Sequence, residues 1–377
     1  MIKSVAYTGV PGITDNTFEF REDLNVFTGE NGTGKTTILK LMWYLYSSNL
    51  YRAIADVNFT TVKLSTSDYT ISIHRELSDK YENIRLVLDS SGDESIVRDG
   101  MVPIRKPDEP PGFIAEVQNF IRSYHESSIF FPTFRRLEGG FSLDKSLKSY
   151  PFAIQTDTVA EAIAKYSEMM SVDDHLFVSS ISTSDIEKLI NDQFSSFMQD
   201  SLRSSVGLSD FITKEIHKYD RSLNISQNPD DSDLKDVQRL VDAIRTRVNE
   251  NNEDRGKRYK PFDVLSDVVG EIFKSKGVTV RKNSLTFGQT TSMVTADKLS
   301  AGEKQMLGFL CYNIFVKKGP FFIDEPELSL HTDWQSMLLP VLIEQGTQNQ
   351  FFIATHSMLI YSKYPDREIR LPLRESL

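Results

Sequence analysis

The chain has 377 residues, of which 39% are hydrophobic and 25% charged, and its formal net charge is −10. This is the composition of a soluble globular protein of one large or two medium domains, and its apolar runs fall far short of the roughly 20 residues that a membrane span needs. The single cysteine excludes an internal disulfide, so we expect a cytoplasmic protein. The negative net charge argues against broad, sequence-independent binding to DNA.

The first third of the chain alternates between apolar and polar residues, which is typical of strands. Between residues 61 and 89 this alternation predicts antiparallel strands with one solvated face. The other expected strands are Ile2–Tyr7, Asn16–Phe20, Leu24–Thr28 and Ser128–Phe131, and the expected helices are Thr36–Ser47 and Phe113–Tyr124.

From roughly Thr156 to Lys276 the sequence differs in character, because helical patterns replace the alternation. From residue 151 to residue 275 there are 15 Lys and Arg residues against 23 Asp and Glu residues, so this segment carries most of the negative charge. No heptad pattern persists over several turns, and we therefore expect no long coiled coil. The expected helices are Val159–Met170, Ser184–Gln199 and Leu234–Asn249, and strands return at Val278–Arg281 and Ser284–Phe287.

A glycine-rich turn at Gly29–Thr36 matches the P-loop pattern G-x-x-x-x-G-K-[ST] at every position, and it lies between a predicted strand and a predicted helix. Its glycines let successive backbone N–H groups converge on phosphate oxygens, and the following helix directs its positive dipole end to the same anion. Lys35 is expected to reach the β- and γ-phosphates, and the Thr36 hydroxyl to join the Mg²⁺ shell. The residues expected to contact ATP here are Glu30, Asn31, Gly32, Thr33, Gly34, Lys35, Thr36 and Thr37.

Two acidic residues end an apolar strand that begins at Pro320. A buried strand that ends at Asp324 places a carboxylate at the edge of the sheet, where it can order the Mg²⁺ shell beside the P-loop. Glu325 is then available to orient and deprotonate the attacking water. Apolar strands that end in Asp-Glu are also common entries into turns, so this pattern gains its weight from the motifs on either side.

Upstream, Leu299–Gln305 has the sequence LSAGEKQ. It resembles the LSGGQ-type signature of ABC ATPases, in the variant of SMC-like and recombination-repair ATPases. The resemblance implies that Ser300, Gly302 and Glu303, at the start of a helix, contact the γ-phosphate bound to a second subunit, so that the site closes only when two ATP-loaded copies meet. The alternative is a plain helix N-cap formed by Ser300 and Glu303.

Downstream, the segment Phe351–Ser357 consists of an apolar strand that ends in His356. It resembles the switch-histidine motif of the same family, which implies that His356 senses the γ-phosphate. Residues Glu327–Gln335 occupy the place of the family's D-loop. The string IDEPExxLH is similar to that of the OLD-like ATPases of bacterial anti-phage systems. The resemblance, to the SMC/OLD-like group of ABC ATPases, covers about residues 1–50 and 285–362.

This resemblance implies an α/β fold, namely an ABC-type P-loop ATPase head with an inserted helical module. A mixed sheet is expected around the P-loop, and residues 1–25 and 61–90 are expected to form an antiparallel lobe. The predicted domains are the N-terminal half of the head at 1–136, the helical insert at 137–277 and the C-terminal half of the head at 278–377.

One position departs from the family pattern. The family has a glutamine after the strand that enters the inserted arm, where it contacts Mg²⁺ and the attacking water. Here the strand is followed by PTFRR at residues 132–136. Gln118 and Gln155 are two substitutes, neither of them convincing, while Arg135 and Arg136 either contact phosphate or belong to a solvated loop.

The resemblance implies an ATPase that uses ATP and Mg²⁺ and works as a homodimer or higher homo-oligomer. It is similar to the ATPase components of PARIS, Septu and retron modules, so we expect it to control a separately encoded effector, such as a nuclease or toxin, in anti-phage defence. The chain ends at Leu377, soon after His356, so we expect no Toprim nuclease domain. The alternatives are a RecF-like DNA-repair ATPase, which the acidic insert disfavours, and a nucleotide-gated scaffold that barely hydrolyses ATP.

Overall fold

The structure of the protein is a computed structural model, and it describes residues 1–78, 80–90, 95–103, 109–124, 126–133, 155–223, 231–274, 278–281, 284–287, 299–316 and 318–372. The chain divides into two compact units, which we describe separately. The first comprises Met1–Ser182 and Leu299–Leu377, and the second comprises Thr183–Lys298. The domain boundaries after residues 136 and 277 follow the order of motifs along the chain, and they stay predictions.

An antiparallel sheet forms one layer of the first unit. Its strands are β1 (Ile2–Thr8), β2 (Asn16–Glu19), β4 (Thr61–Thr66), β5 (Tyr69–Leu77), β6 (Tyr81–Ser90) and β7 (Ile96–Pro103). They lie in the order β2-β1-β4-β5-β6-β7, and each neighbouring pair is antiparallel. Alternate residues of the middle strands are buried, so one face of the sheet lies against the core, as the alternation predicted.

A parallel sheet forms the second layer. Its strands are β3 (Leu24–Thr28), β8 (Ser128–Phe131), β9 (His175–Phe177), β12 (Pro320–Asp324), β13 (Gln350–Ala354) and β14 (Glu368–Arg370). They lie in the order β14-β3-β13-β12-β8-β9. The sheet around the P-loop was expected to be mixed, but each described pairing is parallel, because its strands are joined by long crossovers rather than hairpins.

Helices cover these sheets. In the first unit they are α1 (Lys35–Tyr46), α2 (Leu50–Asp56), α3 (Gly112–Arg122), α4 (Gln155–Met170), α7 (Ala301–Phe315), α8 (Thr332–Glu344) and α9 (Met358–Tyr361), with 3₁₀ turns η4 (Pro326–Leu328) and η5 (Pro365–Arg367). Helix α3 packs against β6 and β7, and α7 packs against α8. The ring of Phe309 in α7 contacts Phe131 of β8 edge-to-face, with 4.9 Å between centroids.

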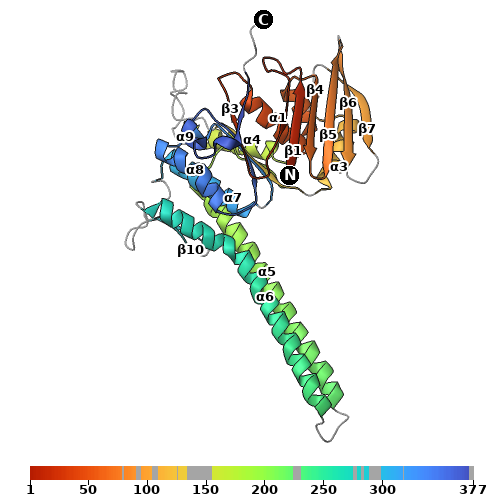
Figure 1. Cartoon of the computed structure of the whole chain (residues 1–377), viewed down its shortest axis with the longest axis vertical. Coiled ribbons are helices and arrows are strands. Elements are labelled where there is room, and N and C mark those ends of the chain that lie inside the picture. The colour runs from red at the N-terminus through yellow and green to blue at the C-terminus, as the bar shows by residue number, and fades with distance from the viewer. Residues whose placement is uncertain are drawn as a thin grey trace. The chain divides into compact units, whose positions relative to one another are not determined.

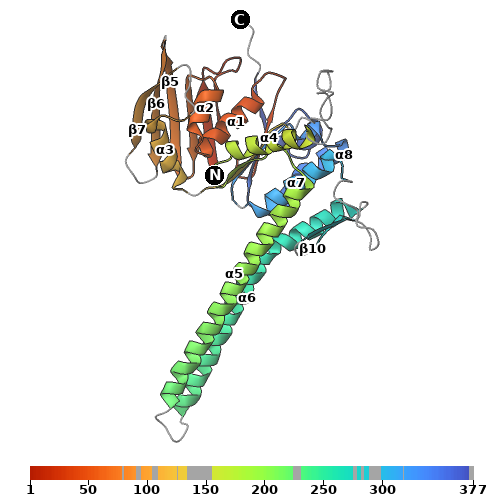
Figure 2. The ribbon, with the colours of Figure 1, turned by 180° about the vertical axis from the view of Figure 1, so that it is seen from behind.

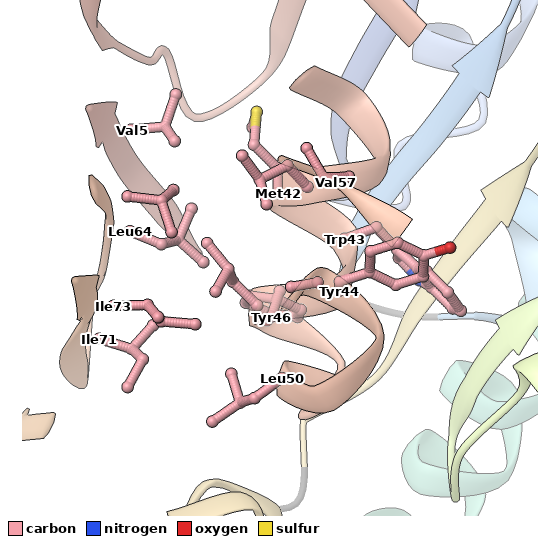
Figure 3. Packing of buried hydrophobic residues seen from close by; sticks show 14 of the residues in the cluster. Val5, Met42, Trp43, Tyr44, Tyr46, Leu50, Val57, Leu64, Ile71 and Ile73 are labelled. Carbon is pink, nitrogen blue, oxygen red and sulfur yellow. The ribbon is translucent and has the colours of Figure 1, made fainter. Parts of the chain in front are cut away.

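Helix α1 lies between the two sheets, because it contacts β4 of one and β8, β12 and β13 of the other. Figure 3 shows Met42 of α1 near the strand residues Val5 and Leu64, which belong to the same buried cluster. On the side of the parallel sheet, Trp43 packs against Phe130, with 5.6 Å between ring centroids. Burial on both sides holds α1 in place, and with it the P-loop that precedes the helix.

The second unit consists mainly of two long helices that run side by side (Figures 1 and 2). Its elements are α5 (Thr183–Leu223), α6 (Asp231–Ile272), β10 (Val278–Arg281) and β11 (Ser284–Phe287). The helices are antiparallel, since Asp200 pairs with Arg258 at 2.9 Å while Ser204 bonds to Asn251, further along α5 but earlier in α6. The strands β10 and β11 lie where strands were predicted, and they pair antiparallel.

The length of these helices contradicts the sequence analysis. Helices were predicted here, but shorter ones and without a long coiled coil, whereas α5 has 41 residues and α6 has 42. The pairing does not depend on a heptad repeat of leucines, because aromatic rings pack between the helices at one end. These rings belong to Phe194, Phe197, Tyr259 and Phe262.

Candidate functional site

The candidate site lies at the carboxyl edge of the parallel sheet. The neighbouring strands β3, β13, β12 and β8 all end at this edge, and each is followed by a segment that contains polar residues. Open parallel sheets bind their ligands at this edge. The segments are residues 29–34 after β3, 355–357 after β13, 325 after β12 and 132–133 after β8.

The loop after β3 has the backbone conformation that the glycine pattern predicted. Gly29, Gly32 and Gly34 have φ angles of 141°, 85° and 89°, which favour glycine. The Lys35 ammonium donates hydrogen bonds to the carbonyl oxygens of Gly29 and Glu30, at 3.0 and 2.9 Å. Burial lowers the pKa of Lys35 from its ordinary value, and nearby carboxylates oppose that shift. The loop therefore presents a desolvated cation next to backbone donors, as an anion site requires.

Both carboxylate oxygens of Asp324 accept a hydrogen bond from a threonine. Thr36 Oγ1 donates to Oδ1 at 2.9 Å, and Thr133 Oγ1 donates to Oδ2 at 2.6 Å. Asp324 is 1% exposed, and its burial raises the pKa of the carboxyl group while the two threonine hydrogen bonds lower it. One carboxylate and two hydroxyls form an all-oxygen set of ligands, and this set fits Mg²⁺.

Glu325 and His356 lie side by side, with 3.9 Å between Oε1 of the glutamate and Nε2 of the histidine. Glu325 has a φ of 48°, which lies in the left-handed region that residues other than glycine rarely adopt. Such backbone strain is typical of functional sites. Burial and the adjacent Asp324 raise the pKa of the Glu325 carboxyl group. A carboxylate of raised pKa beside an imidazole can orient a water molecule and accept its proton.

Helix α7 begins with the capping box that the sequence left as an alternative. Ser300 Oγ accepts from the Glu303 N–H at 3.3 Å, and Glu303 Oε2 accepts from the Ser300 N–H at 2.8 Å. Gly302 packs against the carbonyl oxygen of Ser329, and Gln305 bonds to the Ser329 hydroxyl. The start of α7 is thus a capped helix N-terminus that is attached to the loop after β12. Phosphate binding by Ser300, Gly302 and Glu303 stays a prediction.

The close contact at Gly302 predicts that adding one methyl group there, by substitution with alanine, destabilises the fold. A Cβ at Gly302 would lie 2.3 Å from the Ser329 carbonyl oxygen, which is backbone and cannot swing away. We expect Gly302→Ala to lower the free energy of unfolding by about 1–3 kcal/mol, measured by denaturant titration. Gly207→Ala in α5 is the matched control, since its Cβ meets nothing within 4 Å and alanine favours helices. Equal stability of both variants would contradict this packing.

The structure brings most of the predicted site residues together. Thr36, at the start of the P-loop helix, contacts Asp324, and Glu325 contacts His356. The start of α7 instead contacts the loop after β12 of its own chain. Of the residues predicted to contact ATP, five lie in the loop after β3 and three in the first turn of α1. They are Glu30, Asn31, Gly32, Thr33 and Gly34, and then Lys35, Thr36 and Thr37.

Thr133 is the site residue that the sequence analysis missed. Gln118, one proposed substitute for the missing glutamine, donates to the Ser48 carbonyl oxygen at 2.6 Å, beyond the far end of α1 from the P-loop. The Gln155 side chain and residues 134–136, with both arginines, lie outside the described parts of the chain. The signal for Thr133 was its place, two residues after the end of β8, where the family has its glutamine.

The sequence of the chain matches a known protein family. The profile of the AAA ATPase domain matches residues 12–360, which include the glycine loop, Asp324, Glu325 and His356. The chain belongs to the AAA ATPase domain family. It is therefore an ATPase, as the glycine-rich loop predicted. The prediction that it is a P-loop ATPase of the SMC/OLD-like group is confirmed.

Individual similar proteins match this AAA ATPase over a short stretch or at low sequence identity. A stretch of 83 residues is 37% identical to Endonuclease GajA of Bacillus cereus (strain VD045), and it covers 20% of this chain and 14% of GajA. Two similar solved structures are the Pyrococcus furiosus Smc head domain with an extended coiled coil bound to the C-terminal domain of ScpA, and an SmcHead bound to the C-winged helix domain of ScpA. Each is 13% identical, over 99% of this chain and 94% of the other, with TM-scores of 0.40 and 0.39.

The described residues of this AAA ATPase contain neither a membrane-spanning helix nor a cluster of metal-binding side chains. No helix among them has both the length and the apolar character to cross a membrane. Nor do they contain a group of three or more His, Cys, Asp or Glu side chains that could hold a metal ion. A Mg²⁺ ion at Asp324 would therefore take its remaining ligands from hydroxyls, water and phosphate, as is usual for this ion.

Proposed function

We propose that this ATPase hydrolyses ATP with Mg²⁺ at two sites formed between two copies of the chain. The loop with Lys35 holds the phosphates, Glu325 orients and deprotonates the attacking water, and His356 contacts the γ-phosphate. The observation that carries this proposal is the placement of Glu325 beside His356 at the sheet edge where the P-loop also lies. The second copy supplies Ser300, since the start of α7 is exposed and attached to the loop after β12 of its own chain.

Mg²⁺, when bound, would supply positive charge that offsets the negative charge of the phosphates during transfer. Thr36, Asp324 and Thr133 are the residues that would hold its shell. In this proposal Asp324 orders both hydroxyls, and Thr133 takes the place of the glutamine that similar ATPases have after the corresponding strand.

Replacing Thr133 with valine, which keeps the side-chain volume, is expected to lower the apparent Mg²⁺ affinity of the protein–nucleotide complex by about 10-fold. The reason is that Asp324 loses the hydroxyl that donates to its Oδ2. The measurement is a Mg²⁺ titration with a fluorescent, non-hydrolysable ATP analogue. Thr70→Val, on the solvated face of β5, is the control. Unchanged Mg²⁺ affinity in Thr133→Val would leave the shell to Thr36 and Asp324.

A subunit-mixing experiment tests whether two copies share the site. Lys35→Ala keeps its signature helix and Ser300→Ala keeps its P-loop, so a mixed dimer contains one intact site. Neither variant alone is expected to hydrolyse ATP appreciably. An equimolar mixture should recover roughly a quarter of the wild-type rate, because half of randomly formed dimers are mixed and each has one intact site of two. No recovery, with both variants folded, would refute the shared site.

We further propose that nucleotide state controls a separate effector, a nuclease or toxin, in the cytoplasm. The similarity to a protein named as an endonuclease supports an effector of this kind, and the single Cys311 suits a reducing compartment. The test is copurification with the products of neighbouring genes, with and without ATP. If the ATPase neither binds nor regulates any of them, this proposal fails. Salt-sensitive, ATP-dependent DNA binding would instead support the RecF-like alternative, which the net charge of −10 disfavours.

A further inference from the structure

Glu327 forms two hydrogen bonds across the site that the proposed mechanism does not use. It lies in the turn η4, two residues after Glu325. Its Oε2 accepts from the Thr355 hydroxyl at 2.8 Å, and its Oε1 accepts from the backbone N–H of His356 at 2.6 Å. One carboxylate from the loop after β12 therefore holds two consecutive residues of the loop after β13.

Gln335 of α8 holds the same two loops from the other side. Its Oε1 accepts from the Ser357 hydroxyl at 2.6 Å, and its Nε2 donates to the carbonyl oxygens of Glu327 and Leu330, at 3.3 and 2.9 Å. The side chains of Glu327 and Gln335 thus bond to Thr355, His356 and Ser357 in turn. Side chains therefore connect the three residues after β13 to the segment after β12.

These contacts matter because the catalytic pair comes from two different loops. Glu325 follows β12 and His356 follows β13, and both side chains are partly exposed, at 24% and 34%. Backbone hydrogen bonds of the sheet still reach Glu325, whose N–H donates to the Ala354 carbonyl oxygen at 2.8 Å, and Thr355, whose N–H donates to that of Phe27 at 3.1 Å. The next N–H, that of His356, donates to the Glu327 carboxylate instead. Hydrogen bonds to a carboxylate are about twice as strong as neutral ones, which makes Glu327 the principal connection.

We propose that Glu327, assisted by Gln335, is a positioning residue that sets the distance between Glu325 and His356. The inference rests on the proposed function, in which these two residues act on the water and the γ-phosphate. Glu327 itself is assigned no contact with either, because its two carboxylate oxygens accept from the Thr355 hydroxyl and the His356 N–H. Loss of the connection lets the histidine loop move away from the nucleotide, and a displacement of about 1 Å can lower a rate by about 100-fold.

The test combines Glu327→Gln with His356→Ala. In Glu327→Gln, one amide oxygen remains as an acceptor, while the amide NH₂ faces the second donor and cannot accept from it. We expect kcat to fall by about 10- to 100-fold with no change in nucleotide affinity. Because Glu327 acts through His356, the double variant should hydrolyse ATP no more slowly than His356→Ala alone. Glu22→Gln, an exposed glutamate of the same unit, is the matched control.

The outcomes separate this inference from the proposed function. If His356→Ala leaves turnover unchanged, the proposed role of the histidine fails. If His356→Ala lowers turnover but Glu327→Gln is silent, or adds its full effect in the double variant, the positioning role is overturned. Should Glu327→Gln fail to fold, Thr355→Val removes one donor and leaves the carboxylate intact. Turnover lowered at unchanged nucleotide affinity then supports the proposal, and unchanged turnover contradicts it.

Discussion

Replacing Lys35 with alanine is expected to weaken ATP binding by about 100-fold, which corresponds to the roughly 3 kcal/mol of a hydrogen bond to a charged group. Lys35 is 5% exposed, and in the structure its ammonium donates to two carbonyl oxygens of the loop. A phosphate would therefore meet a cation that is already desolvated and close to its place. Alanine removes this charge and the hydrogen bonds that it donates to the carbonyl oxygens of Gly29 and Glu30. Isothermal titration calorimetry with a non-hydrolysable ATP analogue measures the effect.

The control for this prediction is Lys63→Ala, which removes the same charge from an exposed position in β4. Its nucleotide affinity should stay within about twofold of wild type, because charges more than a Debye length apart are screened. If both variants bind ATP equally well, the loop at residues 29–34 is not the phosphate site. The shared site between two copies then loses its basis too, since it requires a bound triphosphate.

The parts of the site that the sequence predicted correctly depend on local pattern. The glycine spacing requires particular backbone conformations, and Gly29, Gly32 and Gly34 have them. The buried strand before Asp324 likewise places its carboxylate at the sheet edge whatever the rest of the chain does. Thr133 could not be found in this way, because its contact with Asp324 joins residues 191 positions apart. A hydroxyl after a short strand has no meaning until the order of strands in the sheet is known.

The same distinction applies to the fold. Strands with regular alternation, such as β5, were predicted, whereas β7 was missed because its residues are mostly exposed and alternate poorly. The length of α5 and α6 was underestimated for a related reason. Much of their surface is polar, and exposed Leu202 and Val206 interrupt any simple apolar face. Their pairing includes long-range contacts, such as the ring of Phe194 against that of Phe262, which sequence periodicity does not reveal.

Glu325→Gln is expected to lower ATP turnover by at least about 100-fold, the lower end of what a general base contributes, while ATP affinity changes little. Glutamine keeps the shape of the side chain but cannot accept the proton of the attacking water. The carboxylate is suited to this task, because burial and the neighbouring Asp324 raise its pKa and so make it a stronger base. Single-turnover kinetics, together with nucleotide titration, separate the chemical step from binding.

A second measurement on Glu325→Gln bears on the assembly. If ATP holds two copies together and hydrolysis releases them, the variant should accumulate as an ATP-bound dimer, visible as a doubled mass by light scattering. Asp324→Asn is the informative comparison, since loss of that carboxylate disturbs Thr36 and Thr133 together and should weaken Mg²⁺-dependent binding before any dimer forms. A Glu325→Gln protein that binds ATP tightly yet stays monomeric at all concentrations would show that ATP binding does not cause dimerisation. The nucleotide would then be hydrolysed within one chain, and the start of α7 would be a helix cap and nothing more.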